Sequence, residues 1–122
     1  MRSLMILVVM AASPVWAESA TCTIEIEDND DLYSVYKLEY KFIFESGGPA
    51  QRRHFAIPGH DYTCTIAFFD LSHGTMISCE YKADLGETFF QSDRSAVREN
   101  VIKNNLSFRH NGAQIYLTTE CR

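Results

Sequence analysis

Four cysteines constrain the fold of this 122-residue chain more than any other feature. Cys22, Cys64, Cys79 and Cys121 all follow an N-terminal segment that has the pattern of an export signal. An even number of cysteines in a short exported chain is typical of a disulfide framework. A zinc site is the alternative, but the sequence has no C-x-x-C pair and an exported protein meets an oxidising environment. The sequence therefore predicts two disulfides and no metal site.

The first 17 residues read as a secretory signal. They contain one positive charge at Arg2, an apolar run from Leu4 to Ala12 and a small-residue pattern that ends at Ala17. This run is much shorter than the roughly 20 residues of a membrane-spanning helix, so a retained anchor is the weaker alternative. A lipoprotein is also a weaker alternative, because Ser19-Ala20-Thr21-Cys22 lacks the aliphatic residue that usually leads an acylation motif. We expect cleavage after Ala17, which leaves one periplasmic or secreted domain of residues 18–122 with no membrane span.

The expected mature chain is acidic. It has 10 basic and 16 acidic residues, a net charge of −6. Nucleic-acid binding depends on clustered Lys and Arg, so this composition argues against it. The negative net charge fits a basic protein partner, but it is equally explained if it only keeps the protein soluble.

A hairpin accounts for one cysteine pair. The alternating runs Tyr62–Phe69 and Thr75–Tyr81 flank a turn-forming segment rich in Asp, Ser and Gly. If Cys64 faces Cys79, the other pairs on that face are apolar or aromatic except for one threonine: Tyr62 with Tyr81, Ile66 with Ile77 and Phe68 with Thr75. Opposed residues of this kind have close Cβ atoms, so the register predicts a Cys64–Cys79 disulfide.

A second hairpin places the remaining pair. Leu106–His110 and Ala113–Cys121 flank Asn111-Gly112, a strong two-residue hairpin signal. The alternation puts Cys121 on the inward face, and Cys22 is inward by the same rule near the other end of the chain. These positions favour a Cys22–Cys121 disulfide between the terminal strands, although sequence alone leaves the other two connectivities of four cysteines open.

The other elements complete an all-β prediction. We expect a long strand over Leu32–Glu45 and a short one over Phe55–Ile57. Ser92-Asp93 can cap a short helix that runs to Asn100 or beyond, with Val97 and Val101 on one face. The chain should therefore form a mainly antiparallel, disulfide-stapled β-sandwich or small barrel with one short helix.

The histidines do not predict catalysis. His54, His60, His73 and His110 show no spacing at which one strand or helix would present two metal ligands, and no hydrolase motif is present. We therefore predict no catalytic residue, metal or cofactor. The alternative is a small hydrolase or metal-dependent enzyme that uses His60, Asp61 or His73.

Two regions are candidate binding sites. In the first, the predicted hairpin turn presents Asp70, Ser72 and His73 on a base braced by a disulfide. On the outer face of the same hairpin, Phe69 and Met76 are apolar neighbours that either contact a partner or lie under the expected helix.

The second region is the densest acidic run, which contains Asp28, Asp30 and Asp31. It lacks the glycine and distal glutamate of an EF-hand. It is either a solvated strand edge or a docking patch for a basic partner.

These features lead to one functional hypothesis and two alternatives. The hypothesis is an inhibitor or immunity-type protein that blocks a basic, envelope-directed enzyme through the braced hairpin, the acidic surface or both. The alternatives are the enzyme described above and a structural or adhesive subunit that pairs through the edge of residues 32–45.

Overall fold

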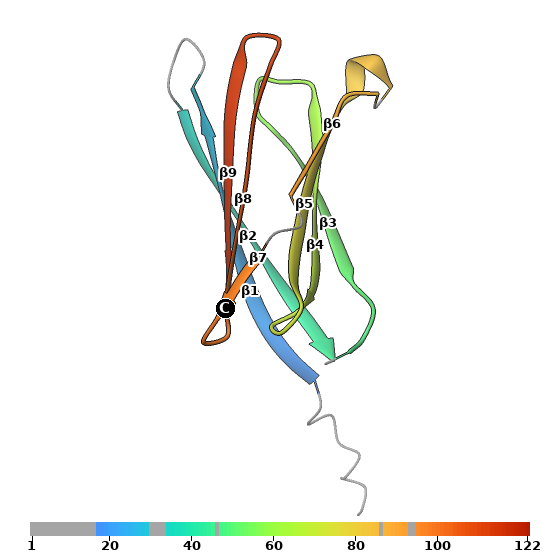
Figure 1. Cartoon of the computed structure of the whole chain (residues 1–122), viewed down its shortest axis with the longest axis vertical. Coiled ribbons are helices and arrows are strands. Elements are labelled where there is room, and N and C mark those ends of the chain that lie inside the picture. The colour runs from blue at the N-terminus through green and yellow to red at the C-terminus, as the bar shows by residue number, and fades with distance from the viewer. Residues whose placement is uncertain (1–16, 30–33, 46, 86, 93–94) are drawn as a thin grey trace, which may run out of the picture.

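Antiparallel strands make up most of the molecule (Figure 1). The computed structural model describes residues 17–29, 34–45, 47–85, 87–92 and 95–122, so the predicted signal lies outside the described residues except for Ala17. The strands are β1 (Ala17–Asp28), β2 (Ser34–Glu45), β3 (Gln51–Ala56), β4 (Tyr62–Asp70), β5 (Gly74–Tyr81), β6 (Phe89–Ser92), β7 (Ser95–Arg98), β8 (Val101–His110) and β9 (Ala113–Cys121).

The strands form two sheets with the apolar core between them, and the described strands do not close into a barrel. The order is β2-β1-β9-β8-β7 in one sheet and β3-β4-β5-β6 in the other. Alternation along each strand directs apolar side chains inward. Phe42 of β2 stacks on Phe68 of β4, with ring centroids 4.9 Å apart. The fold is therefore a β-sandwich, which confirms the predicted fold class.

Both predicted hairpins have the expected register. In β4 and β5, Cys64 lies opposite Cys79 and Ile66 opposite Ile77; in β8 and β9, Phe108 lies opposite Ile115. The structure also contains both predicted disulfides, Cys64–Cys79 and Cys22–Cys121. Such bridges are typical of extracellular or periplasmic proteins.

The helix expected over residues 92–100 is wrong. Residues Ser95–Arg98 form β7, which pairs with the start of β8 through a turn at Glu99 and Asn100. Both turn residues have positive φ, 55° and 63°, as a type I′ hairpin turn requires. The four-residue spacing of Val97 and Val101 thus reflects a turn between two strands. The single helical element among the described residues is one 3₁₀ turn, η3 (Lys82–Asp84).

A buried polar bridge joins the sheets. The side-chain amide of Asn104, 2% exposed, donates to the carbonyl oxygens of Thr75 at 3.1 Å and Ser92 at 3.2 Å. The hydroxyl of Ser92 donates back to Asn104 Oδ1 at 2.9 Å. This bridge holds β8 of one sheet against the beginning of β5 and the end of β6 in the other. It therefore fixes one side of the β4–β5 turn.

Candidate functional site at the β4–β5 tip

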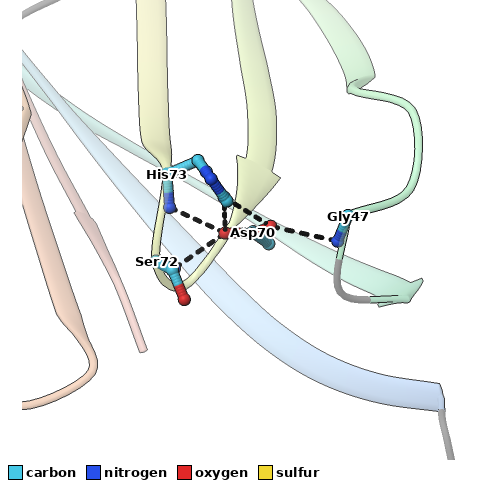
Figure 2. A network of polar contacts seen from close by, with 4 residues as sticks. All are labelled: Gly47, Asp70, Ser72 and His73. Atoms are coloured by element: carbon cyan, nitrogen blue, oxygen red, sulfur yellow. Dashed lines mark hydrogen bonds and ion pairs between the residues drawn. The ribbon is translucent and has the colours of Figure 1, made fainter.

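The turn between β4 and β5, Asp70–Gly74, lies at one end of the sandwich, beside the β2–β3 connection (Figure 1). We call these residues the β4–β5 tip. Asp70 organises it from within, because its side chain is only 5% exposed and points back into the turn (Figure 2). Oδ1 of Asp70 accepts hydrogen bonds from the backbone N–H groups of Ser72 at 2.8 Å and His73 at 2.7 Å. Asp residues commonly stabilise turns in this way.

Two further contacts complete the network of Asp70. Nδ1 of His73 lies 2.9 Å from each carboxylate oxygen, and the backbone N–H of Gly47 donates to Oδ2 at 3.3 Å. Gly47 belongs to the β2–β3 connection, so one carboxylate joins two loops that are 23 residues apart in sequence. The tip is therefore fixed to the neighbouring connection.

The network also determines the charge of Asp70. Burial alone would raise the pKa of this carboxyl group, but hydrogen bonds from the His73 side chain and from the N–H groups of His73, Ser72 and Gly47 outweigh it. Together they lower the pKa of Asp70 from 3.8 to about 2. Asp70 is therefore ionised, and its charge is directed into the turn.

Strand β7 also contacts the tip, next to Asn104, which lies opposite Ser95 in the β7–β8 pair. Gly74 has φ +93°, and a Cβ atom built on it would lie 2.0 Å from Oγ of Ser95 in β7. The same Oγ accepts a hydrogen bond from the backbone N–H of Thr75 at 3.3 Å. Glycine is required here by both the backbone conformation and the close approach of β7.

The tip presents two polar side chains to solvent. Ser72 is exposed, and the side chain of His73 is 71% exposed although one of its nitrogens contacts Asp70. Leu71, which precedes them in the turn, is half-buried and packs against the core. The exposed surface therefore combines an imidazole and a hydroxyl on a backbone held by the Asp70 carboxylate, the β2–β3 connection and β7, an arrangement suited to hydrogen bonding with a partner.

Asp70, His73 and Ser72 have the residue types of a catalytic triad but not its geometry. In a triad the serine hydroxyl lies against the imidazole that activates it. Here the backbone N–H of Ser72 enters the network, and Figure 2 shows its hydroxyl pointing away from His73. The three side chains form a stabilised turn with exposed polar atoms.

The structure separates the other predicted site residues from the tip surface. Phe69 is half-buried, and Met76 is half-buried beside Gln91, whose side-chain amide contacts the Met76 sulfur at 3.2 Å. Ala67 lies opposite Met76 and is 1% exposed. Met76 lies on the outer face of the four-stranded sheet, where no helix covers it among the described residues.

The predicted acidic run lies elsewhere. Asp28 ends β1, at the opposite end of the sandwich from the tip (Figure 1). It is 7% exposed, and its Oδ2 lies 2.7 Å from Nε2 of His60. Asp28 therefore joins β1 to the β3–β4 connection. Asp30 and Asp31 lie outside the described residues.

An aromatic cluster at that opposite end was not predicted. The Tyr62 hydroxyl lies 2.6 Å from Nδ1 of His110, and the ring of Tyr81 is centred 4.7 Å from that imidazole. Burial, followed by the nearby Tyr81 and Asp84, raises the pKa of Tyr62. The predicted pairing of Tyr62 with Tyr81 was the available signal, but the contact with His110 crosses between sheets.

The described part of the chain contains no group of three or more His, Cys, Asp or Glu residues that could hold a metal ion. It also contains no helix long and apolar enough to cross a membrane.

Comparisons with known proteins give one similarity in shape. No protein-family model and no curated protein matches the sequence. Among solved structures, the crystal structure of the ywiB protein from Bacillus subtilis aligns over 93% of this chain and 97% of its own, with 11% identity and a TM-score of 0.48.

Proposed function

We propose that this protein is an exported binding protein of the inhibitor or immunity type, which blocks an envelope-directed enzyme by inserting the β4–β5 tip into the enzyme. One observation carries the proposal: the exposed Ser72 and His73 stand on a turn whose backbone is fixed by the buried carboxylate of Asp70. A fixed loop loses little conformational entropy when it binds.

Several features support this function. The Cys64–Cys79 disulfide lies across the two strands that carry the tip, and β7 and the β2–β3 connection hold it from the sides. The negative net charge of the chain would attract a basic enzyme and speed association. The predicted signal and the two disulfides favour a periplasmic location, where such an enzyme would act.

Inhibition assays test the proposal directly. The protein, purified after export, would be titrated into assays of three classes of cell-wall hydrolase: glycosidases, amidases and endopeptidases. We expect inhibition of at least one class. Ser72→Ala and His73→Ala should each raise the inhibition constant about tenfold or more, as expected for central contact residues. Ser72→Ala is the cleaner variant, because only the backbone N–H of Ser72 joins the Asp70 network.

His54→Ala provides the matched control. His54 is also an exposed histidine with a hydrogen-bonded ring nitrogen, 2.8 Å from Oγ1 of Thr65, but it lies on the outer face of the four-stranded sheet. The His54→Ala variant should inhibit as strongly as the unsubstituted protein, and thermal melts should show that all three variants are folded. Equal inhibition by tip variants and control would contradict insertion of the tip, and no inhibition of any class would contradict the inhibitor function itself.

A further inference from the structure

Strand β2 forms an edge of the five-stranded sheet, and among the described residues it pairs on one side, with β1. The direction of its backbone groups follows from β1. Thr21 of β1 exchanges two backbone hydrogen bonds with Arg122, at 2.8 and 3.0 Å, so the odd-numbered residues of β1 bond toward β9. Hydrogen bonds alternate along an antiparallel strand, so even-numbered residues of β1 bond to β2.

The same alternation applies to β2 itself. Its even-numbered residues pair with even-numbered residues of β1, as Tyr40 does with Cys22. The N–H and C=O groups of its odd-numbered residues therefore point outward from the sheet. The side chain of Gln51 confirms this direction near the end of β2, where it donates to the carbonyl oxygen of Ile43. From Val35 to Lys41 the outward backbone groups form a row available for another strand.

The inner face of this segment is incompletely covered. Phe42 and Phe44, near the end of β2, are buried in the core, whereas Tyr36, Leu38 and Tyr40 are only half-buried. In Figure 1 the end of β2 approaches β3, while its beginning lies at the upper left, away from the four-stranded sheet. An added strand would both bond to the exposed backbone and cover these three apolar and aromatic side chains.

The outer face shows which strand fits. Its exposed side chains alternate in charge, with Lys37, Glu39 and Lys41 in succession. When β2 meets an antiparallel copy of itself with Leu38 opposite Leu38, each Lys37 faces Glu39 of the second copy. On the inner face the same register places each Tyr36 opposite Tyr40 of the second copy. The strand is therefore self-complementary in both charge and apolar contact.

We propose that two copies of this protein associate through their β2 edges in this antiparallel register, centred on Leu38, to form one continuous ten-stranded sheet. This association does not depend on the proposed inhibitor function, because it uses none of the tip residues. Each Lys37 keeps its 3.7 Å contact with Glu25 of its own chain and gains Glu39 of the second copy.

Neighbouring registers are disfavoured for specific reasons. Centring the pair on Glu39 would set the two Glu39 side chains against each other and Lys37 against Lys41. Centring it on Tyr40 would require the backbone of Ile43, whose carbonyl oxygen is already bound by Gln51. The Leu38 register uses Val35 to Lys41 and leaves that contact intact.

Sedimentation equilibrium with charge-swapped variants tests the association. The purified protein should show a concentration-dependent monomer–dimer equilibrium. Glu39→Lys would place positive side chains opposite each other on both sides of the two-fold axis, and should weaken the dimer about tenfold or more. Adding Lys37→Glu to Glu39→Lys restores opposite charges and should restore dimerisation. A strictly monomeric wild-type protein, or no rescue by the double variant, would overturn the proposal.

A cross-link tests the register independently of charge. In the proposed pairing, the two Leu38 residues form a non-hydrogen-bonded pair with Cα atoms about 4.5 Å apart, which permits a disulfide. Leu38→Cys should therefore give a covalent dimer on oxidation, whereas Tyr36→Cys should not, because each Tyr36 faces Tyr40. Cross-linking of Tyr36→Cys in place of Leu38→Cys would overturn the register. Binding of an unrelated extended peptide to β2 of a monomeric protein would overturn self-association.

Discussion

At the scale of single residues, the Asp70 carboxylate makes the stability of the fold depend on pH. Its pKa is about 2 in the folded protein, below the ordinary value of 3.8. The ionised group therefore stabilises the fold above about pH 4, and this contribution is lost as the pH falls toward 2. We expect a loss of about 1–2 kcal/mol over that interval, after allowance for solvent screening near the surface. Urea unfolding at a series of pH values would measure it.

Asp70→Asn isolates this contribution. The amide cannot accept all the hydrogen bonds that the carboxylate accepts, so the variant should be less stable near neutral pH and should lose part of the stability change between pH 4 and pH 2. Asp61→Asn, at an exposed aspartate, should leave both quantities nearly unchanged. An unchanged acid profile in Asp70→Asn would show that other groups govern acid sensitivity.

At the scale of elements, the sequence predicted the two hairpins whose own residues indicate which positions lie opposite each other. Cys64 and Cys79 fix one register, and Asn111-Gly112 fixes the turn of another. The hairpin of β7 and β8 lacks such a signal, because Glu99 is an unusual residue at positive φ and Asn100 is equally suited to the end of a helix. The contact that gives β7 its role, its approach to Gly74, depends on tertiary packing that local pattern does not encode.

The close approach of β7 to Gly74 can be tested by substitution. Gly74→Ala should destabilise the protein by more than the roughly 1–2 kcal/mol expected from a positive φ alone, because the new methyl group would collide with Ser95 of β7. Gly112→Ala is the matched control, with a similar φ of +82° and open space around the added Cβ. Thermal or urea unfolding of both would compare them. Equal losses would mean that β7 does not press on the tip.

At the scale of the whole molecule, the residue pairing within hairpins was predictable and the contacts between sheets were not. The sequence indicated that Asp70, Ser72 and His73 share a turn, but not that Gly47, 23 residues away, donates to Asp70. It indicated an acidic run at Asp28, but not that the side chain of His60, 32 residues further on, contacts that carboxylate. Such contacts depend on how the sheets pack, which alternation within one strand leaves undetermined.

The two disulfides should differ in their contribution to global stability. Cys22–Cys121 joins residues 99 apart and Cys64–Cys79 joins residues 15 apart. In the chain-entropy model, closing the longer loop is worth about 4.7 kcal/mol and the shorter about 3 kcal/mol. Paired Cys→Ala variants at each bridge, compared by urea unfolding, should show the larger loss for Cys22–Cys121. The reverse order would indicate that strain or residual structure outweighs loop length.

The Cys22–Cys121 bridge also decides how the molecule carries mechanical load. It lies between neighbouring strands β1 and β9, and nearly all of the sandwich falls within the loop it closes. A pull that reaches Cys22 and Cys121 from the two chain ends passes through the covalent S–S bond, so the hydrogen bonds formed within the closed loop bear none of it. While oxidised, the domain is an inextensible link in any chain that contains it; once reduced, the same pull would peel β1 from β9.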